Sequence, residues 1–74
     1  MTNYVIVIHP AEEGGYWAEV PVLPGCYTQA ETIDDLIANA GEAIESHIEA
    51  LHAGGQRVPD EAIIIATVRV PEAA

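Results

Sequence analysis

The 74-residue chain contains a single cysteine, Cys26, so an internal disulfide is excluded. Its Cys and His residues are too few and too scattered for a zinc site of the usual type. A chain this short buries only about 60% of its unfolded surface on folding, so its stability is expected to be marginal. Without a disulfide or a structural metal, we expect the chain to gain stability by forming a homo-oligomer, a dimer or larger.

Long hydrophobic runs are also lacking. The longest, residues 62–66, is far shorter than the roughly 20 residues that a membrane-spanning helix needs. The first residues carry no basic segment of the kind that opens a signal peptide. Together with the unpaired cysteine, these features predict a cytoplasmic protein that does not contact membranes.

Basic residues are nearly absent. Arg57 and Arg69 face twelve Asp and Glu residues, which gives a formal net charge of -10. Binding to phosphates requires clusters of Lys or Arg, so the charge argues against nucleic acid as a direct partner and against an anionic membrane surface. It favours either a basic protein partner, attracted over long range, or simply an acidic surface that keeps a small protein in solution.

Half of the residues are hydrophobic, as in a folded domain, and they form short β-branched runs. Residues 3–9 predict a strand that is apolar on both faces, either central in a sheet or at an edge covered by a second subunit. Residues 16–20 predict a second strand, joined to the first through the glycine-containing turn at 12–15 as a hairpin. The Pro24-Gly25 pair predicts another turn, followed by a third strand over residues 26–29.

A long helix is the clearest element. Thr32 can cap it, with Asp35 three residues on in a variant of the capping box, and Gly54-Gly55 can end it after about 20 residues. Apolar residues recur at a spacing of three to four and predict one buried face: Ile33, Leu36, Ile37, Ala40, Ile44, His47, Ile48 and Leu51.

Residues 63–70 predict a fourth strand, which gives a β-β-β-α-β order and a two-layer α+β domain over residues 1–74. Its two sides are both partly apolar: Ile64, Ala66, Val68 and Val70 on one, Ile63, Ile65, Thr67 and Arg69 on the other. One helix can cover only one face of the sheet. An uncovered apolar face usually marks an interface, so we expect a dimer or a partner-bound form.

The ordered motifs in this chain resemble those of the HicB family of antitoxins. They are an aromatic-x-Ala at residues 16–18, Leu-Pro-Gly-Cys at residues 23–26, and a threonine at the helix start, Thr32. The resemblance continues along the helix and covers roughly residues 3–70. The chain departs from the family pattern at Val22, where an acidic residue is frequent, and at residues 30–31, where Gly-Asp is usual.

The resemblance implies a partial RNase H fold and an oligomer that binds and neutralises HicA, a small basic toxin that cleaves RNA. Many family members also carry a C-terminal DNA-binding domain. We expect none in these 74 residues, where the chain ends at Ala74. The leading hypothesis is therefore an antitoxin-like binding domain. The alternatives are an orphan structural or regulatory homo-oligomer without a toxin, and a metal-dependent nuclease.

The candidate partner-binding residues fall into two groups. Trp17 and Tyr27 are aromatic anchors for a partner, or else pack in the core or a dimer interface. The acidic residues are docking groups for a basic partner, or else a solvated surface: Glu12, Glu13 and Glu19, together with an outward helix stripe of Asp35, Glu42, Glu45 and Glu49.

Catalysis is not expected. Metal-dependent nucleases hold their ions with carboxylates grouped on strands around one cleft, whereas Glu19 is the only acidic residue within a predicted strand. No Cys-His spacing indicates a nucleophile, and Cys26 is expected to be a small buried hydrophobe. His47 and His52 point about 140° apart on a helix and cannot share a metal ion. We therefore predict no catalytic residue, no metal and no cofactor.

Overall fold

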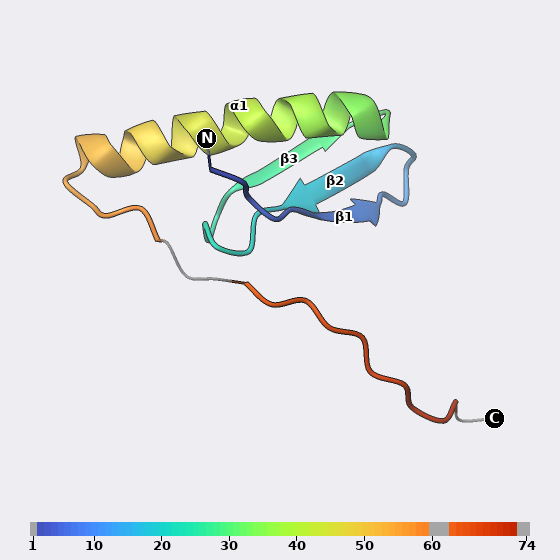
Figure 1. The fold of residues 1–74 in the computed structure, drawn as a ribbon. Helices are drawn as coiled ribbons and strands as arrows, with labels where there is room; N and C mark the ends of the chain where they lie inside the picture. The colour runs from blue at the N-terminus through green and yellow to red at the C-terminus, as the bar shows by residue number, and fades with distance from the viewer. Residues whose placement is uncertain (1, 60–62, 73–74) are drawn as a thin grey trace.

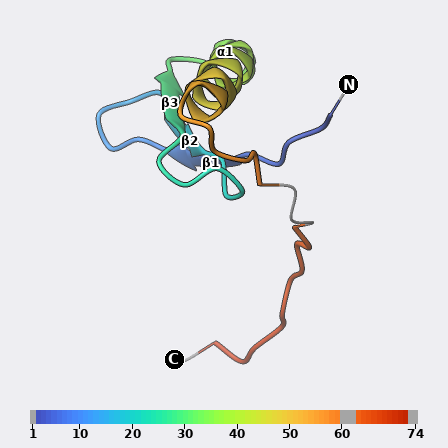
Figure 2. The same cartoon turned by 90° about the vertical axis from the view of Figure 1, so that its left-hand side faces the viewer.

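The computed structural model describes residues 2–59 and 63–72. In order, the chain forms β1 (Val7–Pro10), β2 (Tyr16–Glu19), β3 (Tyr27–Ala30) and α1 (Ile33–Ala53). The strands form an antiparallel sheet in the order β1-β2-β3, and α1 lies across one face of it (Figures 1 and 2). The predicted two-layer α+β class is confirmed.

The β1–β2 hairpin forms where the glycines predicted it. Val7 pairs with Glu19 and Pro10 with Tyr16, and the turn closes through a hydrogen bond from the Ala11 amide to the Gly15 carbonyl. Gly15 has a φ of 74°, and a Cβ at this position would lie 2.8 Å from the Ala30 carbonyl oxygen. Glycine is therefore required here both for the backbone angle and for the close approach of the start of β2 to the end of β3.

The connection from β2 to β3 carries part of the core. It closes through hydrogen bonds from the Val20 amide to the Cys26 carbonyl and from the Cys26 amide to the Leu23 carbonyl. Gly25 adopts a φ of 84° at the predicted turn. The loop folds Leu23 inward, and its side chain is buried with Val20 and Cys26 against Ile44 of the helix.

Both predicted helix caps are confirmed. The Thr32 hydroxyl accepts a hydrogen bond from the Asp35 amide at 3.1 Å. At the other end the Gly55 amide donates to the His52 carbonyl and the Gln56 amide to the Leu51 carbonyl, with Gly55 at a φ of 71°. This is the Schellman arrangement, which satisfies carbonyls that the last turn leaves without partners.

The buried face of the helix is narrower than predicted. Leu36, Ala40 and Ile44 are buried, but Ile33 and Ile37 are 45% and 54% exposed. The helix packs on β3 and, less extensively, on β2, and it lies clear of β1. The prediction of full burial was wrong at Ile33 and Ile37 because this three-stranded sheet is too narrow to cover the whole apolar stripe.

The first strand is shorter than predicted and lies at an edge of the sheet. Residues 3–6 belong to no strand, because Val7 already pairs with the last residue of β2, and Val20 turns into the following loop. The prediction of a central strand was thus wrong. The alternative prediction, an edge strand covered by a second subunit, is open at the edge of β1.

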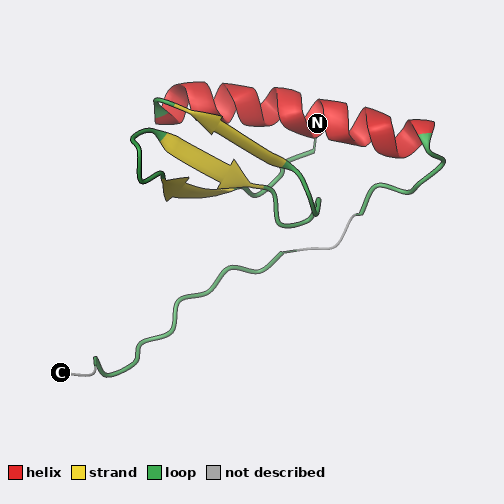
Figure 3. Ribbon diagram, turned by 180° about the vertical axis from the view of Figure 1, so that it is seen from behind, coloured by secondary structure: helices red, strands yellow, loops and turns green. Residues whose placement is uncertain are grey.

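The predicted fourth strand does not form. Residues 63–72 are extended but belong to no helix or strand, and they run away from the domain on the side opposite the helix (Figures 1 and 3). A strand exists only when its backbone groups pair with a neighbour. Within the described part of this single chain, residues 63–70 have no such neighbour, so a strong β pattern yields no strand.

Candidate protein-binding face

The face of the sheet that the helix leaves uncovered holds the candidate site. Side chains alternate across a strand, and Ala18 of β2 is fully buried under the helix. Its neighbours Trp17 and Glu19 therefore project from the opposite face. The register places His9 of β1 beside Trp17, and Tyr27 of β3 beside Glu19. We call the group His9, Trp17, Glu19 and Tyr27 the outer sheet face.

A row of rings crosses the three strands on the outer sheet face. The His9 and Trp17 rings stack with their centroids 4.3 Å apart and their planes 17° apart. Trp17 and Tyr27 lie 6.2 Å apart with their planes tilted by 53°. Both distances lie at or close to the range in which ring pairs attract one another, so the rings hold each other in place on the surface.

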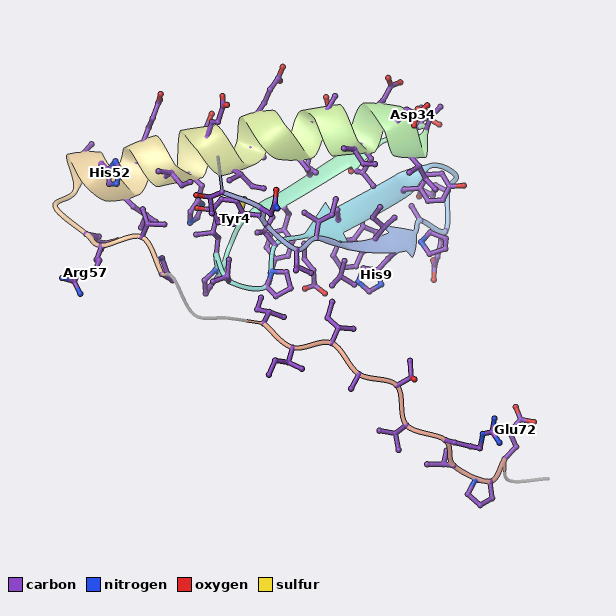
Figure 4. All side chains as sticks on the ribbon, viewed as in Figure 1. Tyr4, His9, Asp34, His52, Arg57 and Glu72 are labelled. Atoms are coloured by element: carbon purple, nitrogen blue, oxygen red, sulfur yellow. The ribbon has the colours of Figure 1, made fainter. Side chains whose placement is uncertain are left out.

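Histidine and glutamate are joined at one end of this row. His9 Nε2 lies 3.2 Å from Glu19 Oε1, at hydrogen-bond distance, and both side chains are 39% exposed. In Figure 4 the His9 side chain projects from β1 away from the helix. The contact fixes the carboxylate beside the rings and leaves it accessible from solvent.

Tyr27 is the most open member of the outer sheet face, with 61% of its surface exposed. Together with Trp17, Thr28 and Gln29 it lines a shallow hollow of about 340 Å³. A hollow with aromatic walls and a carboxylate nearby suits a flat cationic side chain such as arginine, which gains both from the π faces and from the negative charge.

The structure divides the predicted partner-binding residues between the two layers. Trp17, Glu19 and Tyr27 meet on the outer sheet face. Asp35, Glu42, Glu45 and Glu49 lie exposed on α1, in the other layer, and Glu45 also lines an open groove between α1 and the first residues of the chain. Glu12 and Glu13 are exposed in the β1–β2 turn. A single small partner on the outer sheet face would therefore not also contact the helix stripe.

Sequence reasoning missed His9 as a member of this group. His9 was not among the predicted partner-binding residues, because its neighbours in the fold, Trp17 and Glu19, lie eight and ten residues further along the chain. Only the hairpin register, Val7 with Glu19 and His9 with Trp17, shows that these side chains share a face. Strand geometry tells which side chains of residues 3–9 lie on the same side of one strand, but it does not tell which side chains they meet on the next strand.

The remaining candidate features are the cysteine, a possible metal site and a possible membrane-spanning helix. Cys26 is buried, as expected, and burial raises the pKa of its thiol, which disfavours the reactive thiolate. Among residues 2–59 and 63–72, no three His, Cys, Asp or Glu side chains gather where they could hold a metal ion. The same residues include no helix long and apolar enough to cross a membrane.

Comparison with known proteins gives a family. Residues 4–74 match the family described as HicB_like antitoxin of bacterial toxin-antitoxin system. UPF0150 protein ssr1765 of Synechocystis is 43% identical over 63 residues, which cover 85% of this chain and 80% of that protein. UPF0150 protein Ta0767 of Thermoplasma acidophilum is 39% identical over 77% of this chain and 83% of its own length.

A named antitoxin is a more distant relative. Antitoxin HicB 1 of Photorhabdus laumondii is 29% identical over 57 residues, which are 77% of this chain but 37% of that protein. The similarity therefore covers most of the present chain and a little over a third of the longer antitoxin.

Proposed function

The chain belongs to the HicB-like antitoxin family of bacterial toxin–antitoxin systems, and from this membership we propose that it neutralises a small, basic, RNA-cleaving toxin of the HicA type by binding it directly. The observation that supports this most is the outer sheet face. It is an exposed aromatic and acidic surface on a chain whose net charge is -10. In this proposal the chain is a binding protein and catalyses no reaction.

The outer sheet face provides the anchor. Interfaces take most of their binding energy from a few residues, often aromatic ones in the centre of the contact. Trp17 and Tyr27 offer such a centre, already held in position by ring contacts, and Glu19 offers a carboxylate at its rim. A toxin that inserts an Arg or Lys side chain between them would have its own RNA-binding charge covered.

The other acidic residues would act at longer range. Glu12 and Glu13 lie at the hairpin end of the sheet, and the helix stripe of Asp35, Glu42, Glu45 and Glu49 adds negative potential from the other layer. Charges at the edge of an interface mainly increase the association rate. We therefore expect the association rate constant to fall steeply from low to high salt. An association rate independent of salt would contradict this part of the proposal.

The test begins with a tagged chain in an extract of the cells that encode it, with captured proteins identified by mass. A captured small basic protein is then purified, and its cleavage of RNA is measured as the chain is added. Inhibition that is complete near one chain per toxin supports the proposal. Recovery of the chain alone, as a stable oligomer, would favour the orphan homo-oligomer instead.

Variants then locate the contact. Trp17→Ala combined with Tyr27→Ala should weaken toxin binding by more than about 100-fold, because both anchors are lost. Ile33→Ala, which shortens another exposed apolar side chain at the start of α1, is the matched control and should bind as the wild type does. Equal weakening by both changes, or by neither, would remove the outer sheet face from the proposal.

A further inference from the structure

The hollow on the outer sheet face joins aromatic and polar groups. Its volume is about 340 Å³, and its lining consists of Trp17, Tyr27, Thr28 and Gln29. The register places Gln29 opposite Trp17, and Gln29 is exposed like Tyr27, two residues before it on β3. A water molecule takes up about 30 Å³ in the liquid, so the hollow has room for a head group of several heavy atoms.

The rings around the hollow leave π faces open on one side. His9 belongs to β1 and Tyr27 to β3, so they flank Trp17 from opposite sides. The His9 ring stacks on Trp17 and covers the side of the indole that is turned towards β1. The side turned towards β3 borders the hollow, together with the tilted ring of Tyr27. The faces of such rings attract cations.

Glu19 supplies negative charge beside the same rings. It pairs with Tyr27 in the register, and its Oε1 lies 3.2 Å from Nε2 of His9, which donates the hydrogen bond. A carboxylate has two oxygens and accepts several hydrogen bonds, so this contact does not use up its capacity. The Glu19 side chain is 39% exposed, and it can therefore accept a second donor from outside.

Neither of the two basic residues of the chain lines the hollow. Figure 4 shows Arg57 beyond the end of α1, well away from His9, and Arg69 lies exposed on the segment that runs away from the domain. The hollow is shallow and leaves Tyr27 largely exposed, whereas sites for free small molecules bury most of their ligand. With a net charge of -10, the chain instead attracts a basic protein, which can bring a cationic side chain to the hollow.

We infer that the hollow is a subsite for an arginine side chain of the partner and prefers arginine to lysine. The inference rests on the proposed function, in which the outer sheet face binds a basic protein. A guanidinium group is flat, so it can lie against a ring while its N–H groups point in its plane towards Glu19 and the amide oxygen of Gln29. An ammonium group is compact and strongly hydrated, and it gains no stacking in a half-open site.

The first test adds two short peptides, acetyl-Gly-Arg-Gly-amide and its lysine counterpart, to the full chain. NMR follows the indole N–H of Trp17, which is the only tryptophan of the chain and gives a single signal. The arginine peptide should shift this signal to saturation and bind at least about threefold more tightly than the lysine peptide. Equal affinities, or no saturable shift with either peptide, would overturn the inference.

The second test uses matched variants. Glu19→Gln and Glu31→Gln remove the same charge, but Glu31 is an exposed residue just after β3 and outside the lining of the hollow. Glu19→Gln should weaken binding of the arginine peptide at least about threefold, and Glu31→Gln should leave it unchanged. Equal weakening would mean a general attraction to negative charge and would overturn the inference. Tyr27→Leu should abolish the preference for arginine, with an unchanged circular dichroism spectrum.

The captured toxin separates this inference from the proposed function. A toxin that the chain binds and inhibits, combined with equal binding of the two peptides, would overturn the arginine subsite and leave the proposed function in place. A preference for the arginine peptide that depends on Glu19 and Tyr27, combined with no captured toxin, would support the subsite and contradict the proposed function.

Discussion

Two segments of this chain have nearly the same β pattern and different structures. Residues 4–9 read Tyr-Val-Ile-Val-Ile-His and residues 63–68 read Ile-Ile-Ile-Ala-Thr-Val. The first segment reaches into β1, because a five-residue turn returns the chain alongside it as β2. The second follows a long helix, has no neighbour close in sequence, and forms no strand. A high β propensity thus favours strand pairing, but a strand forms only where a neighbouring strand is available to pair with.

The folded domain and the exposed segment at residues 63–70 should differ most when an apolar side chain in each is shortened. Leu36 is fully buried under the helix, so Leu36→Ala should lower the free energy of unfolding by about 2–5 kcal/mol. Ile65→Ala in the exposed segment should change it by less than about 0.5 kcal/mol in protein too dilute to associate. Urea denaturation measures both. A comparable loss at Ile65 in dilute protein would mean that the segment packs on its own domain.

The turn that gives β1 its partner can be strained directly. Gly15→Ala places a Cβ 2.8 Å from the Ala30 carbonyl oxygen at a φ of 74°, and should cost about 1–3 kcal/mol. Gly14→Ala, at a φ of 101° but with open space around its Cβ, is the control and should cost less. The measurement is again the free energy of unfolding. We expect the larger loss for Gly15→Ala, and a larger loss for Gly14→Ala would contradict this prediction.

The helix start should contribute a smaller amount. Thr32→Ala removes the hydroxyl that accepts from the Asp35 amide, and should lower the free energy of unfolding by about 1 kcal/mol. Ser46→Ala, at an exposed position within α1, should have no destabilising effect, because alanine favours the helix interior. Thermal unfolding of both variants would show the difference. Equal melting temperatures would mean that the cap does not stabilise the helix.

The smallest effect concerns pH. Burial raises the pKa of the Cys26 thiol above that of an unfolded chain, so the unfolded state ionises first as the pH rises. Unfolding then releases a proton, and stability should fall above pH about 8.5, where a free thiol begins to titrate. The Cys26→Ala variant lacks this contribution. Urea denaturation at each pH from 8 to 10 should therefore show the free energy of unfolding of the wild type falling relative to that of Cys26→Ala.

Much of the fold was predictable from local signals. Thr32 and Gly55 cap the helix, and the glycines at 14–15 and 25 turn the chain, as their backbone preferences predicted. The order of the first three strands and the helix followed from these signals and from the apolar periodicity. The burial of individual helix side chains did not follow from these local signals. Ile33 and Ile37 match the period of the buried face, yet the width of the sheet leaves them exposed.

The candidate site was predictable only in part. Trp17, Glu19 and Tyr27 could be chosen by residue type, but their meeting with His9 on one face depends on the strand register. The separation of the helix stripe from the sheet residues likewise depends on which face of the sheet the helix covers.

The sequence by itself determined the local conformations, the acidic charge and the family, because caps, turns and periodicity act between residues close in the chain. Only the tertiary structure decided which side chains share the outer sheet face and which flank of the helix stays open. It also decided that residues 63–70 pair with none of the other residues that the structure describes. These features depend on pairing and packing between segments far apart in sequence, and there the neighbour in space sets the outcome.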